Sequence, residues 1–338
     1  MKIYTIFTGG TIGSRIDQNG QVTPTDTSPY KLLDLYNNRY PDDTEFVIEE
    51  PYRILSENLT VEHIRVLIQS VNQALKTKDI DGIIITHGTD TLQYSAALLG
   101  YLFGNAQIPI LVVSADYTLN DKRSNGLDNF RYALKFIGGK YGRGVFVSYR
   151  NTDGVPVIHR GTRLQQHLPL SADIVSVADS WHGKFDGDRY IQNPHYITKH
   201  GMDAMFDKVE NIHLNACPNG IMRIVPYVGM SYPELSENIQ VVLHESFHSG
   251  TIAISEELKR FSEKAEYLKI PIFLSGLSER EAEYETVNCY RNFGIQPLRE
   301  SAPIAQYCKL WLAVSNELAL ENVMNISVAE DFVYNNFR

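Results

Sequence analysis

Two short segments near the start of the chain combine glycine with threonine hydroxyls in the same order. Residues 8–11 read TGGT, and residues 86–91 read THGTDT. A hydroxyl is a weak nucleophile until a neighbouring group takes its proton. Glycine lets the backbone approach a ligand closely, and exposed amides after a tight turn can face a developing oxyanion. These residue types together predict nucleophilic attack by a threonine on a carbonyl carbon.

Each segment taken alone has a simpler explanation. A glycine pair after a first strand is more often a phosphate-binding or merely tight turn, His87 is more often structural, and Asp90 could cap the following helix. The glycine fingerprints of dinucleotide-binding and P-loop proteins are absent from the sequence. Two such segments at the expected strand ends of one sheet favour the catalytic interpretation.

The elements that must position these segments alternate between strand and helix. Residues 60–76 carry apolar side chains at spacings of three and four, which predicts an amphipathic helix. Apolar β-branched runs predict buried strands at 3–7, 83–86, 108–113 and 144–149, with further helices at 91–103 and 126–137. This alternation predicts a doubly wound, mostly parallel, Rossmann-like α/β sheet, in which ligands bind beyond the carboxyl ends of the strands.

The remainder of the chain predicts a second, smaller α/β domain. A turn at 151–154 predicts a hairpin, and residues 180–198 show no clear period. We expect an N-terminal domain over residues 1–198 that carries the site, a linker at 199–211, and a C-terminal domain over 212–338. Strands near 220–225, 239–244 and 271–274, with helices at 256–268 and 302–314, are expected in the smaller domain.

Composition excludes several classes of function. The formal net charge is −9 and no run of Lys or Arg is visible, which argues against nucleic acid as a partner. The three cysteines lie far from metal-ligand spacing, so no metal site is expected. The N-terminus lacks the long apolar stretch of a signal peptide, and no segment approaches a membrane span, so we expect a cytoplasmic protein without a membrane partner.

At these motifs the sequence resembles the bacterial-type L-asparaginases, and most closely their cytoplasmic type I form. The stretches FTGGTIGS at 7–14 and ITHGTDTLQYSA at 85–96 resemble the two signature motifs of that family. Residues 110–130 are similar to the stretch after the family's third buried strand, and LSENLT at 55–60 is similar to its substrate-binding loop. The resemblance covers roughly residues 1–170 and thins beyond them.

The resemblance implies catalytic roles for three residues and no cofactor. Thr11 would attack the side-chain amide carbon of asparagine and form an acyl-enzyme, with release of ammonia. Thr89 and Asp90 would belong to the second catalytic group, and water would then cleave the ester to leave aspartate. The family also implies a homodimer or homotetramer in which the partner's second domain closes the pocket. A mobile lid is expected at about 13–30.

The resemblance also implies the substrate contacts. Ser56 would bind the α-carboxylate, Asp90 would help hold the α-amino group, and Gly88 and the backbone at Ala115 would line the site. Glu57, beside Ser56, departs from the family pattern. We expect its carboxylate to strengthen the binding of a ligand ammonium, although a solvated loop charge is the alternative.

Two further departures concern groups that move protons. Gln21 stands where the family has a tyrosine that helps activate the nucleophile, with Tyr30 as an alternative source. Gln166 stands where the family has a lysine after its R-G-x-R element, and His167 or Lys122 are the alternative replacements. Because glutamine cannot act as a base in any ordinary pH range, proton transfer is expected to be altered.

These departures leave several hypotheses open. The leading one is hydrolysis of the side-chain amide of L-asparagine. The main alternative is a catalytically impaired homologue that binds an amino acid as a sensor, or an enzyme for a different amide. The asparaginase-like subunit of a tRNA-dependent amidotransferase is disfavoured, because we expect no room for that subunit's additional N-terminal domain before the first strand. A nucleotide-binding α/β protein is the remaining possibility.

Overall fold

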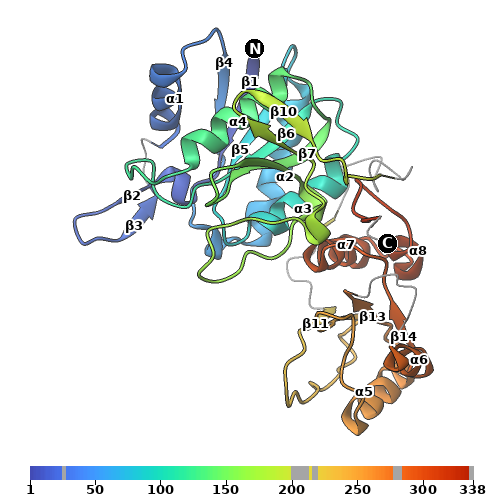
Figure 1. Ribbon diagram of the computed structural model, residues 1–338. Coiled ribbons are helices and arrows are strands. Elements are labelled where there is room, and N and C mark those ends of the chain that lie inside the picture. Colours follow the sequence, from blue (N-terminus) through green and yellow to red (C-terminus); the bar gives the residue numbers. More distant parts are fainter. Residues whose placement is uncertain (25–27, 199–212, 215–219, 277–283, 335–338) are drawn as a thin grey trace.

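The computed structural model describes residues 1–24, 28–198, 213–214, 220–276 and 284–334. An eight-stranded sheet forms the larger body of the molecule, and a four-stranded sheet forms a smaller body beside it (Figure 1). The expected linker at 199–211 lies outside the described residues, so the domain boundaries stay a prediction. The mixed α/β architecture confirms the predicted fold class.

The large sheet has the strand order β10-β9-β8-β7-β6-β5-β1-β4. Its parallel strands are β1 (Lys2–Phe7), β4 (Glu45–Glu49), β5 (Gly82–Thr86), β6 (Pro109–Val113) and β7 (Gly144–Arg150). Three further strands continue the sheet in antiparallel pairs: β8 (Pro156–Arg160), β9 (Gly183–Asp186) and β10 (Arg189–Gln192).

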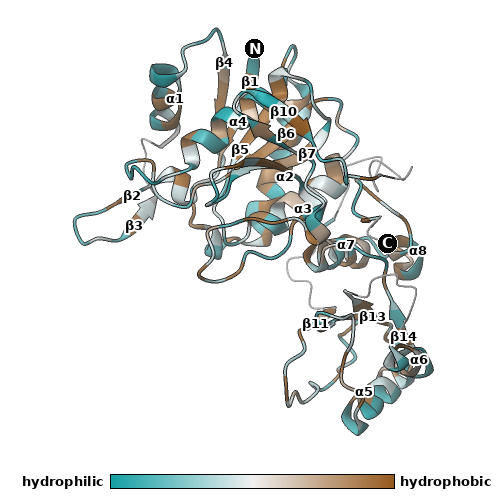
Figure 2. Ribbon diagram, in the orientation of Figure 1, coloured by the Kyte–Doolittle hydropathy of each residue, from teal (hydrophilic) through white to brown (hydrophobic). Residues whose placement is uncertain are grey.

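Helices cover both faces of this sheet, as the continuous apolar strands require. The helices α2 (Val61–Lys76) and α3 (Leu92–Phe103) pack on one face, and α1 (Ser28–Arg39) and α4 (Gly126–Gly138) pack on the other. Side chains along β5 alternate between them: Ile83 and Ile85 join the first cluster, and Ile84 joins the second. Figure 2 shows these strands as the hydrophobic centre of the larger body.

The smaller sheet has the order β11-β12-β13-β14 and is wholly parallel. Its strands are β11 (Ile221–Ile224), β12 (Val241–Glu245), β13 (Ile272–Ser275) and β14 (Ile295–Pro297). The helices α5 (Glu256–Tyr267) and α6 (Glu285–Asn292) pack on one face. On the other face α7 (Pro303–Ser315), followed by α8 (Leu320–Met324), packs against both the sheet and α3. One apolar cluster therefore runs through both bodies.

Two segments differ from the sequence-based expectation. The stretch 180–198 shows no clear period, yet it forms β9 and β10, which are four residues each and joined by a turn at Gly187. The expected lid holds an antiparallel hairpin of β2 (Ser14–Ile16) and β3 (Val22–Pro24), and α1 begins at its end. Strands this short carry too few alternating residues to be recognised from pattern alone.

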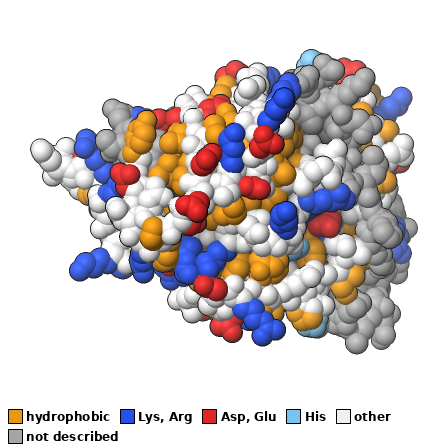
Figure 3. All heavy atoms as spheres, turned by 90° about the horizontal axis from the view of Figure 1, so that it is seen from above, with side chains coloured by type: hydrophobic (Ala, Val, Ile, Leu, Met, Phe, Trp, Pro, Cys, Tyr) orange, Lys and Arg blue, Asp and Glu red, His pale blue; other side chains and the backbone are white. Residues whose placement is uncertain are grey.

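Four short 3-10 helices complete the described structure: η1 (Thr11–Gly13), η2 (Ser56–Asn58), η3 (Gly161–Arg163) and η4 (Val177–Asp179). On the face shown in Figure 3, acidic and basic side chains are interspersed and no continuous basic surface is visible. Within the described ranges, no helix is both long and apolar enough to cross a bilayer.

Candidate active site

The two threonine segments leave neighbouring strands at the same edge of the large sheet. The strands β1 and β5 are parallel and adjacent, and their register pairs Phe7 with Thr86. Immediately beyond, the Thr8 hydroxyl donates a hydrogen bond of 2.6 Å to the Thr86 carbonyl. The structure thus brings both segments to the carboxyl ends of their strands, as the sequence predicts.

The glycines of the two segments are in backbone contact. A Cβ placed on Gly10 would lie 2.4 Å from the Gly88 amide nitrogen, and one on Gly88 would lie 3.3 Å from the Gly10 Cα. Gly10 also has φ of 76°, a conformation that side chains other than glycine rarely adopt. Since consecutive Cα atoms are ~3.8 Å apart, the Cα atoms of Thr11 and Thr89 lie within roughly 12 Å of each other. The two threonine loops therefore form one site.

A third segment completes this site from the loop that precedes α2. The Gly10 amide donates to the Ile54 carbonyl at 2.8 Å, and the Ile54 amide donates to the Thr8 carbonyl at 3.1 Å, which extends the edge of the sheet. Ser56 follows at the start of η2 and is 4 % exposed. A Cβ on Gly88 would lie only 2.4 Å from the Ser56 hydroxyl oxygen. The predicted carboxylate-binding serine thus lies directly against the second threonine loop.

Carboxylate side chains lie close to Ser56. The Ser56 hydroxyl lies 3.5 Å from an Asp90 carboxylate oxygen, and Thr91 donates to the Ser56 carbonyl at 2.9 Å. Asp90 and Glu57 are both exposed. Two carboxylates beside a loop of hydroxyls and glycine backbone form a suitable place for a ligand that carries an ammonium group. The structure places Asp90 beside Ser56, and its role stays a prediction.

The backbone amides of Thr11 and Thr89 have no hydrogen-bond acceptor among the described residues. Both Thr11 and Thr89 are half-buried. Among the described residues, neither of these amides donates a hydrogen bond, whereas the neighbouring amides of Gly10 and Gly13 both do. Backbone donors left open beside paired hydroxyls can hold the negative charge of a tetrahedral intermediate.

Ala115 follows β6 and lies beneath the first threonine loop. It is 0 % exposed, so only its backbone can contribute to the site. A Cβ on Gly126, at the start of α4, would meet both the Ala115 side chain at 2.9 Å and Ile12 at 3.3 Å. The structure thus places Ala115 close to η1, and the lining role of its backbone stays a prediction.

The candidates for the first proton-handling group are exposed, although α1 and β3, the elements that hold or follow them, both contact η1 of the first threonine loop. Gln21 is exposed at the turn of the β2–β3 hairpin, where its backbone amide donates to the Asp17 carboxylate at 2.8 Å. This hairpin projects from the larger body (Figure 1). Tyr30 lies in α1 and is 65 % exposed. Among the described residues, neither side chain forms a hydrogen bond with Thr11.

Gln166 has a partner that the sequence does not predict. Its side-chain oxygen accepts a hydrogen bond of 3.0 Å from the Arg223 guanidinium, which reaches over from β11. The same guanidinium donates to the Tyr94 hydroxyl at 3.1 Å and pairs with Glu245 at 2.6 Å. Tyr94 lies in the first turn of α3, four residues after Asp90. A fixed cation from the smaller sheet is therefore held at the position where the family has a lysine.

The other two candidates for this role are engaged elsewhere or exposed. His167 contacts the Ser171 carbonyl through its Nε2 at 2.7 Å, within its own loop. Lys122 is exposed in the segment that precedes α4. No local signal in the sequence links position 166 to position 223, because the two are 57 residues apart. Gln166 lies in the loop after η3, whereas Arg223 lies in β11 of the smaller sheet.

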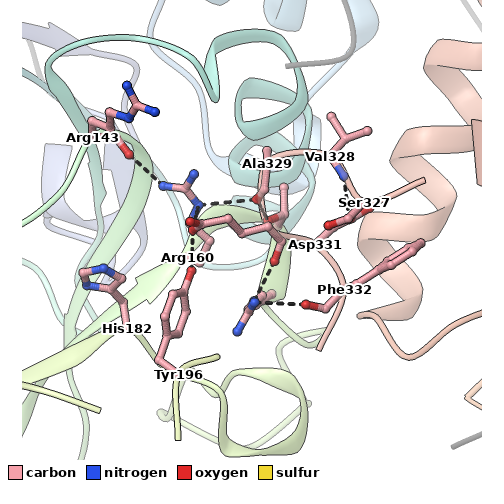
Figure 4. Close-up of polar contacts among 12 residues, drawn as sticks. Arg143, Arg160, His182, Tyr196, Ser327, Val328, Ala329, Asp331 and Phe332 are labelled. Atoms are coloured by element: carbon pink, nitrogen blue, oxygen red, sulfur yellow. Dashed lines mark hydrogen bonds and ion pairs between the residues drawn. The ribbon is translucent and has the colours of Figure 1, made fainter. Parts of the chain in front are cut away.

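The R-G-x-R element at 160–163 holds the chain's C-terminal segment. The Arg163 guanidinium is fully buried and donates to the carbonyls of Glu330 at 2.7 Å and Phe332 at 3.0 Å. Arg160 pairs with the Glu330 carboxylate at 3.1 Å, and the Thr162 hydroxyl donates to Ala329 (Figure 4). We call residues 328–333 the C-terminal strap. The element thus has a structural role, and the pairing of Arg160 with Phe146 places its start toward the edge of the sheet opposite the threonine loops.

In the part of the chain that the structure describes, no group of three His, Cys, Asp or Glu side chains is arranged to hold an ion. The chemistry that the loops can offer comes from their own hydroxyls, amides and carboxylates.

Comparisons with known proteins agree with this geometry. Residues 2–186 match the family model described as asparaginase, N-terminal. A glutamyl-tRNA(Gln) amidotransferase subunit from Pyrobaculum aerophilum is 32 % identical over 168 residues, which cover 49 % of this chain and 39 % of that protein. L-asparaginase 1 of Escherichia coli K12 is 29 % identical over 141 residues, 41 % of each chain. The matches thus span about two fifths of the length of these relatives.

Solved structures share the fold over nearly the whole chain. The thermostable L-asparaginase from Thermococcus kodakarensis superposes with a TM-score of 0.78 at 21 % identity, covering 99 % of this chain and 100 % of that one. L-asparaginase I from Vibrio cholerae gives a TM-score of 0.76 at 21 % identity, covering 98 % and 99 %. At this identity the likeness establishes the architecture of both bodies and nothing further.

Proposed function

Because the chain belongs to the asparaginase family of amidohydrolases, we propose that it hydrolyses the side-chain amide of an amino acid, with L-asparagine as the first substrate to test. The observation that carries this proposal is the backbone contact between Gly10 and Gly88, which joins two threonine-bearing loops at one edge of the sheet. The curated relatives include both an L-asparaginase and an amidotransferase subunit, so the choice of amide is part of the proposal.

The proposed reaction proceeds through an ester on threonine. The Thr11 oxygen attacks the amide carbon, its proton is transferred to the leaving nitrogen, and ammonia departs as the C–N bond breaks. Water then attacks the ester carbon, gives its proton back to the Thr11 oxygen, and releases the free acid. In both steps the negative charge on the carbonyl oxygen would be held by the open amides of Thr11 and Thr89.

The rest of the ligand would be oriented by fixed groups around the same loops. A ligand α-carboxylate would accept from the Ser56 hydroxyl, and the α-ammonium would lie between the carboxylates of Asp90 and Glu57. Fixing both ends of a small amino acid converts an intermolecular reaction into an effectively intramolecular one. The closeness of the Ser56 hydroxyl to Asp90, 3.5 Å, supports this arrangement.

An ammonia-release assay across asparagine, glutamine and related amides tests the proposal. We expect release from asparagine at a rate that Thr11→Ala and Thr89→Val each lower by at least about 10³-fold. The exposed Thr152 provides the matched control, because Thr152→Ala should leave the rate unchanged. No release from any amino-acid amide at high protein concentration would refute the enzymatic proposal.

A second candidate is an amino-acid sensor that binds without turnover. It is motivated by the exposed position of Gln21 on its hairpin and by the Gln166–Arg223 contact, because together they leave both proton-handling positions without a base. A thermal-shift titration separates the two functions. Saturable stabilisation by aspartate or asparagine with no ammonia released would favour the sensor.

We further propose that the chain forms a homodimer or homotetramer in the cytoplasm, as the family resemblance implies. Sedimentation velocity at several protein concentrations tests the assembly. A single monomeric species at micromolar concentration would refute it.

A further inference from the structure

His87 is a buried residue of the second threonine loop, and both of its ring nitrogens lie within hydrogen-bond distance of other protein groups. The residue is 2 % exposed. Its Nδ1 is 2.8 Å from the carbonyl oxygen of Gly88, the next residue along the chain. Its Nε2 is 2.9 Å from the hydroxyl of Ser95, a buried residue in the first turns of α3. The ring therefore links the loop to the helix that follows it.

These contacts determine which nitrogen carries the proton. A carbonyl oxygen can only accept, so the contact with Gly88 requires the hydrogen on Nδ1. Burial lowers the pKa of His87 below its ordinary value, which leaves the ring neutral with a single N–H. The Nε2 atom must then accept a hydrogen bond, and the Ser95 hydroxyl donates it.

The bond to Gly88 also fixes the amide of Thr89. The Gly88 carbonyl and the Thr89 N–H belong to one planar trans peptide, so they point in opposite directions. With the carbonyl held toward the buried ring, the Thr89 N–H points away from it, toward the exposed side of the loop. Among the described residues, the Thr89 amide donates no hydrogen bond to another group of the protein.

We propose that His87 is a positioning residue: its Nδ1–H tautomer, which the Gly88 carbonyl requires and the Ser95 hydroxyl supports by donating to Nε2, orients the Gly88–Thr89 peptide so that the Thr89 amide faces the substrate carbonyl. The proposal rests on the proposed function, because it assigns that amide to the reaction. His87 takes no proton from Thr11 here, since both of its nitrogens are already engaged inside the protein. Its contribution is the orientation of a backbone donor that would stabilise the transition state.

Three variants test this role. His87→Leu removes the donor to Gly88, and we expect kcat to fall about 10²–10³-fold, the usual loss for one oxyanion donor. His87→Asn keeps an N–H near the position of Nδ1 and should retain kcat within about tenfold. Ser95→Ala leaves the ring but removes the hydrogen bond that holds its Nε2 side, and a smaller fall of several-fold in kcat is expected. In all three the dissociation constant for aspartate should change less than about threefold, because the amino-acid ends bind elsewhere.

A spectroscopic measurement tests the tautomer without relying on activity. In a two-bond ¹H–¹⁵N correlation of imidazole-labelled protein, the signals lost in His87→Asn should show the neutral Nδ1–H pattern and keep it as the pH falls below about 6.5, the ordinary histidine pKa. Ser95→Ala should keep the Nδ1–H pattern, because the Gly88 carbonyl remains, and should shift only the Nε2 signal that loses its hydrogen bond. An Nε2–H pattern in the wild-type protein would overturn the proposal.

The kinetic outcomes separate this proposal from the proposed function. If the wild-type protein releases no ammonia, the function fails while the spectrum still reports the tautomer. If the wild-type protein is active and His87→Leu or His87→Asn lowers aspartate binding as much as kcat, His87 has only a structural role. If His87→Leu does not fold, His87→Asn and Ser95→Ala carry the same comparison.

Discussion

The threonine loops and the C-terminal strap are held in place by different kinds of interaction. At the loops the contacts are mostly backbone to backbone: Gly10 abuts Gly88 and donates to Ile54, with little side-chain bulk between them. At the strap the contacts run through buried charged side chains, such as Arg163 to the carbonyls of residues 330 and 332, and Lys309 to Asp331 at 2.8 Å.

This difference determines how each region responds to change. A backbone contact between glycines tolerates no added atom, so the site is rigid and any side chain there displaces it. A buried ion pair tolerates no lost partner, because the remaining charge is left without compensation in a low-dielectric interior. Changes at the loops should therefore appear in activity first, whereas changes at the strap should appear in stability first.

The largest expected effect is on stability, at the strap. Lys309 and Asp331 are each 1 % exposed, and Asp331 also accepts from the Tyr101 hydroxyl at 3.1 Å. We expect Asp331→Ala to lower the free energy of unfolding by about 3–5 kcal/mol. The matched control is Asp188→Ala, which removes an exposed carboxylate paired with Lys135 and should leave stability almost unchanged, because water screens the pair. Urea denaturation measures the free energy of unfolding of both variants. An equal loss of stability in the two would contradict the proposed difference between the strap and the surface.

Gly10→Ala should have the next largest effect, and chiefly on activity. Its Cβ would lie 2.4 Å from the Gly88 amide, so the two loops must separate. We expect ammonia release to fall about 10²-fold or more, since small misplacements of reacting groups have effects of this size. Gly20→Ala is the control, because it has a similar φ of 79° with nothing within 4 Å of its Cβ. Similar loss of activity in both variants would mean that the contact is unimportant.

Low pH should lower the stability of the folded protein through a buried histidine that lies outside the threonine loops. His159 contacts the Ser176 hydroxyl, and burial lowers its pKa to about 3. Between the ordinary value of about 6.5 and this folded value, only the unfolded chain takes up the proton, so stability falls as the pH falls. At a pH of about 4.5 this amounts to about 2–3 kcal/mol.

Thermal unfolding between pH values of about 7 and 4.5 measures this contribution. His159→Gln should show a smaller fall in Tm over this range than the wild-type protein. The exposed His248 provides the control, and His248→Gln should keep the wild-type slope. Parallel slopes for all three proteins would show that His159 does not contribute.

The smallest expected effect concerns the cation beside Gln166. Gln166→Lys alone places an ammonium next to the Arg223 guanidinium, and like charges there should keep the new lysine from a productive position. Gln166→Lys with Arg223→Gln removes that repulsion, so we expect the double variant to release ammonia several-fold faster than the single one. If Gln166→Lys alone gives the full gain, Arg223 does not govern this position.

The sequence predicts the loops better than the strap for a physical reason. Glycines and threonines at strand ends follow directly from local backbone requirements, so both loops, the strands β1 and β5 and the helix α2 are all predictable. In the structure Thr60 caps α2, and its side chain accepts a hydrogen bond from the His63 backbone amide. The roles of the site residues remain predictions, because geometry places them together without showing a ligand.

Long-range side-chain partners leave no comparable local pattern. Arg160 and Arg163 are recognisable as a motif, but nothing near them indicates partners 167 to 169 residues further along the chain. The contact of Arg223 with Gln166 escapes prediction for the same reason. Short strands such as β9 and β10 escape it because four residues contain too little alternation to distinguish a strand from a loop.

A crystal structure of the protein soaked with L-aspartate tests the central claim most directly. The account predicts density for the amino acid between Thr11 and Thr89, with its α-carboxylate on Ser56 and its side-chain oxygens facing the Thr11 hydroxyl and the Thr89 amide. Aspartate bound at another surface, with the loops around Gly10 and Gly88 empty at saturating ligand, would contradict it.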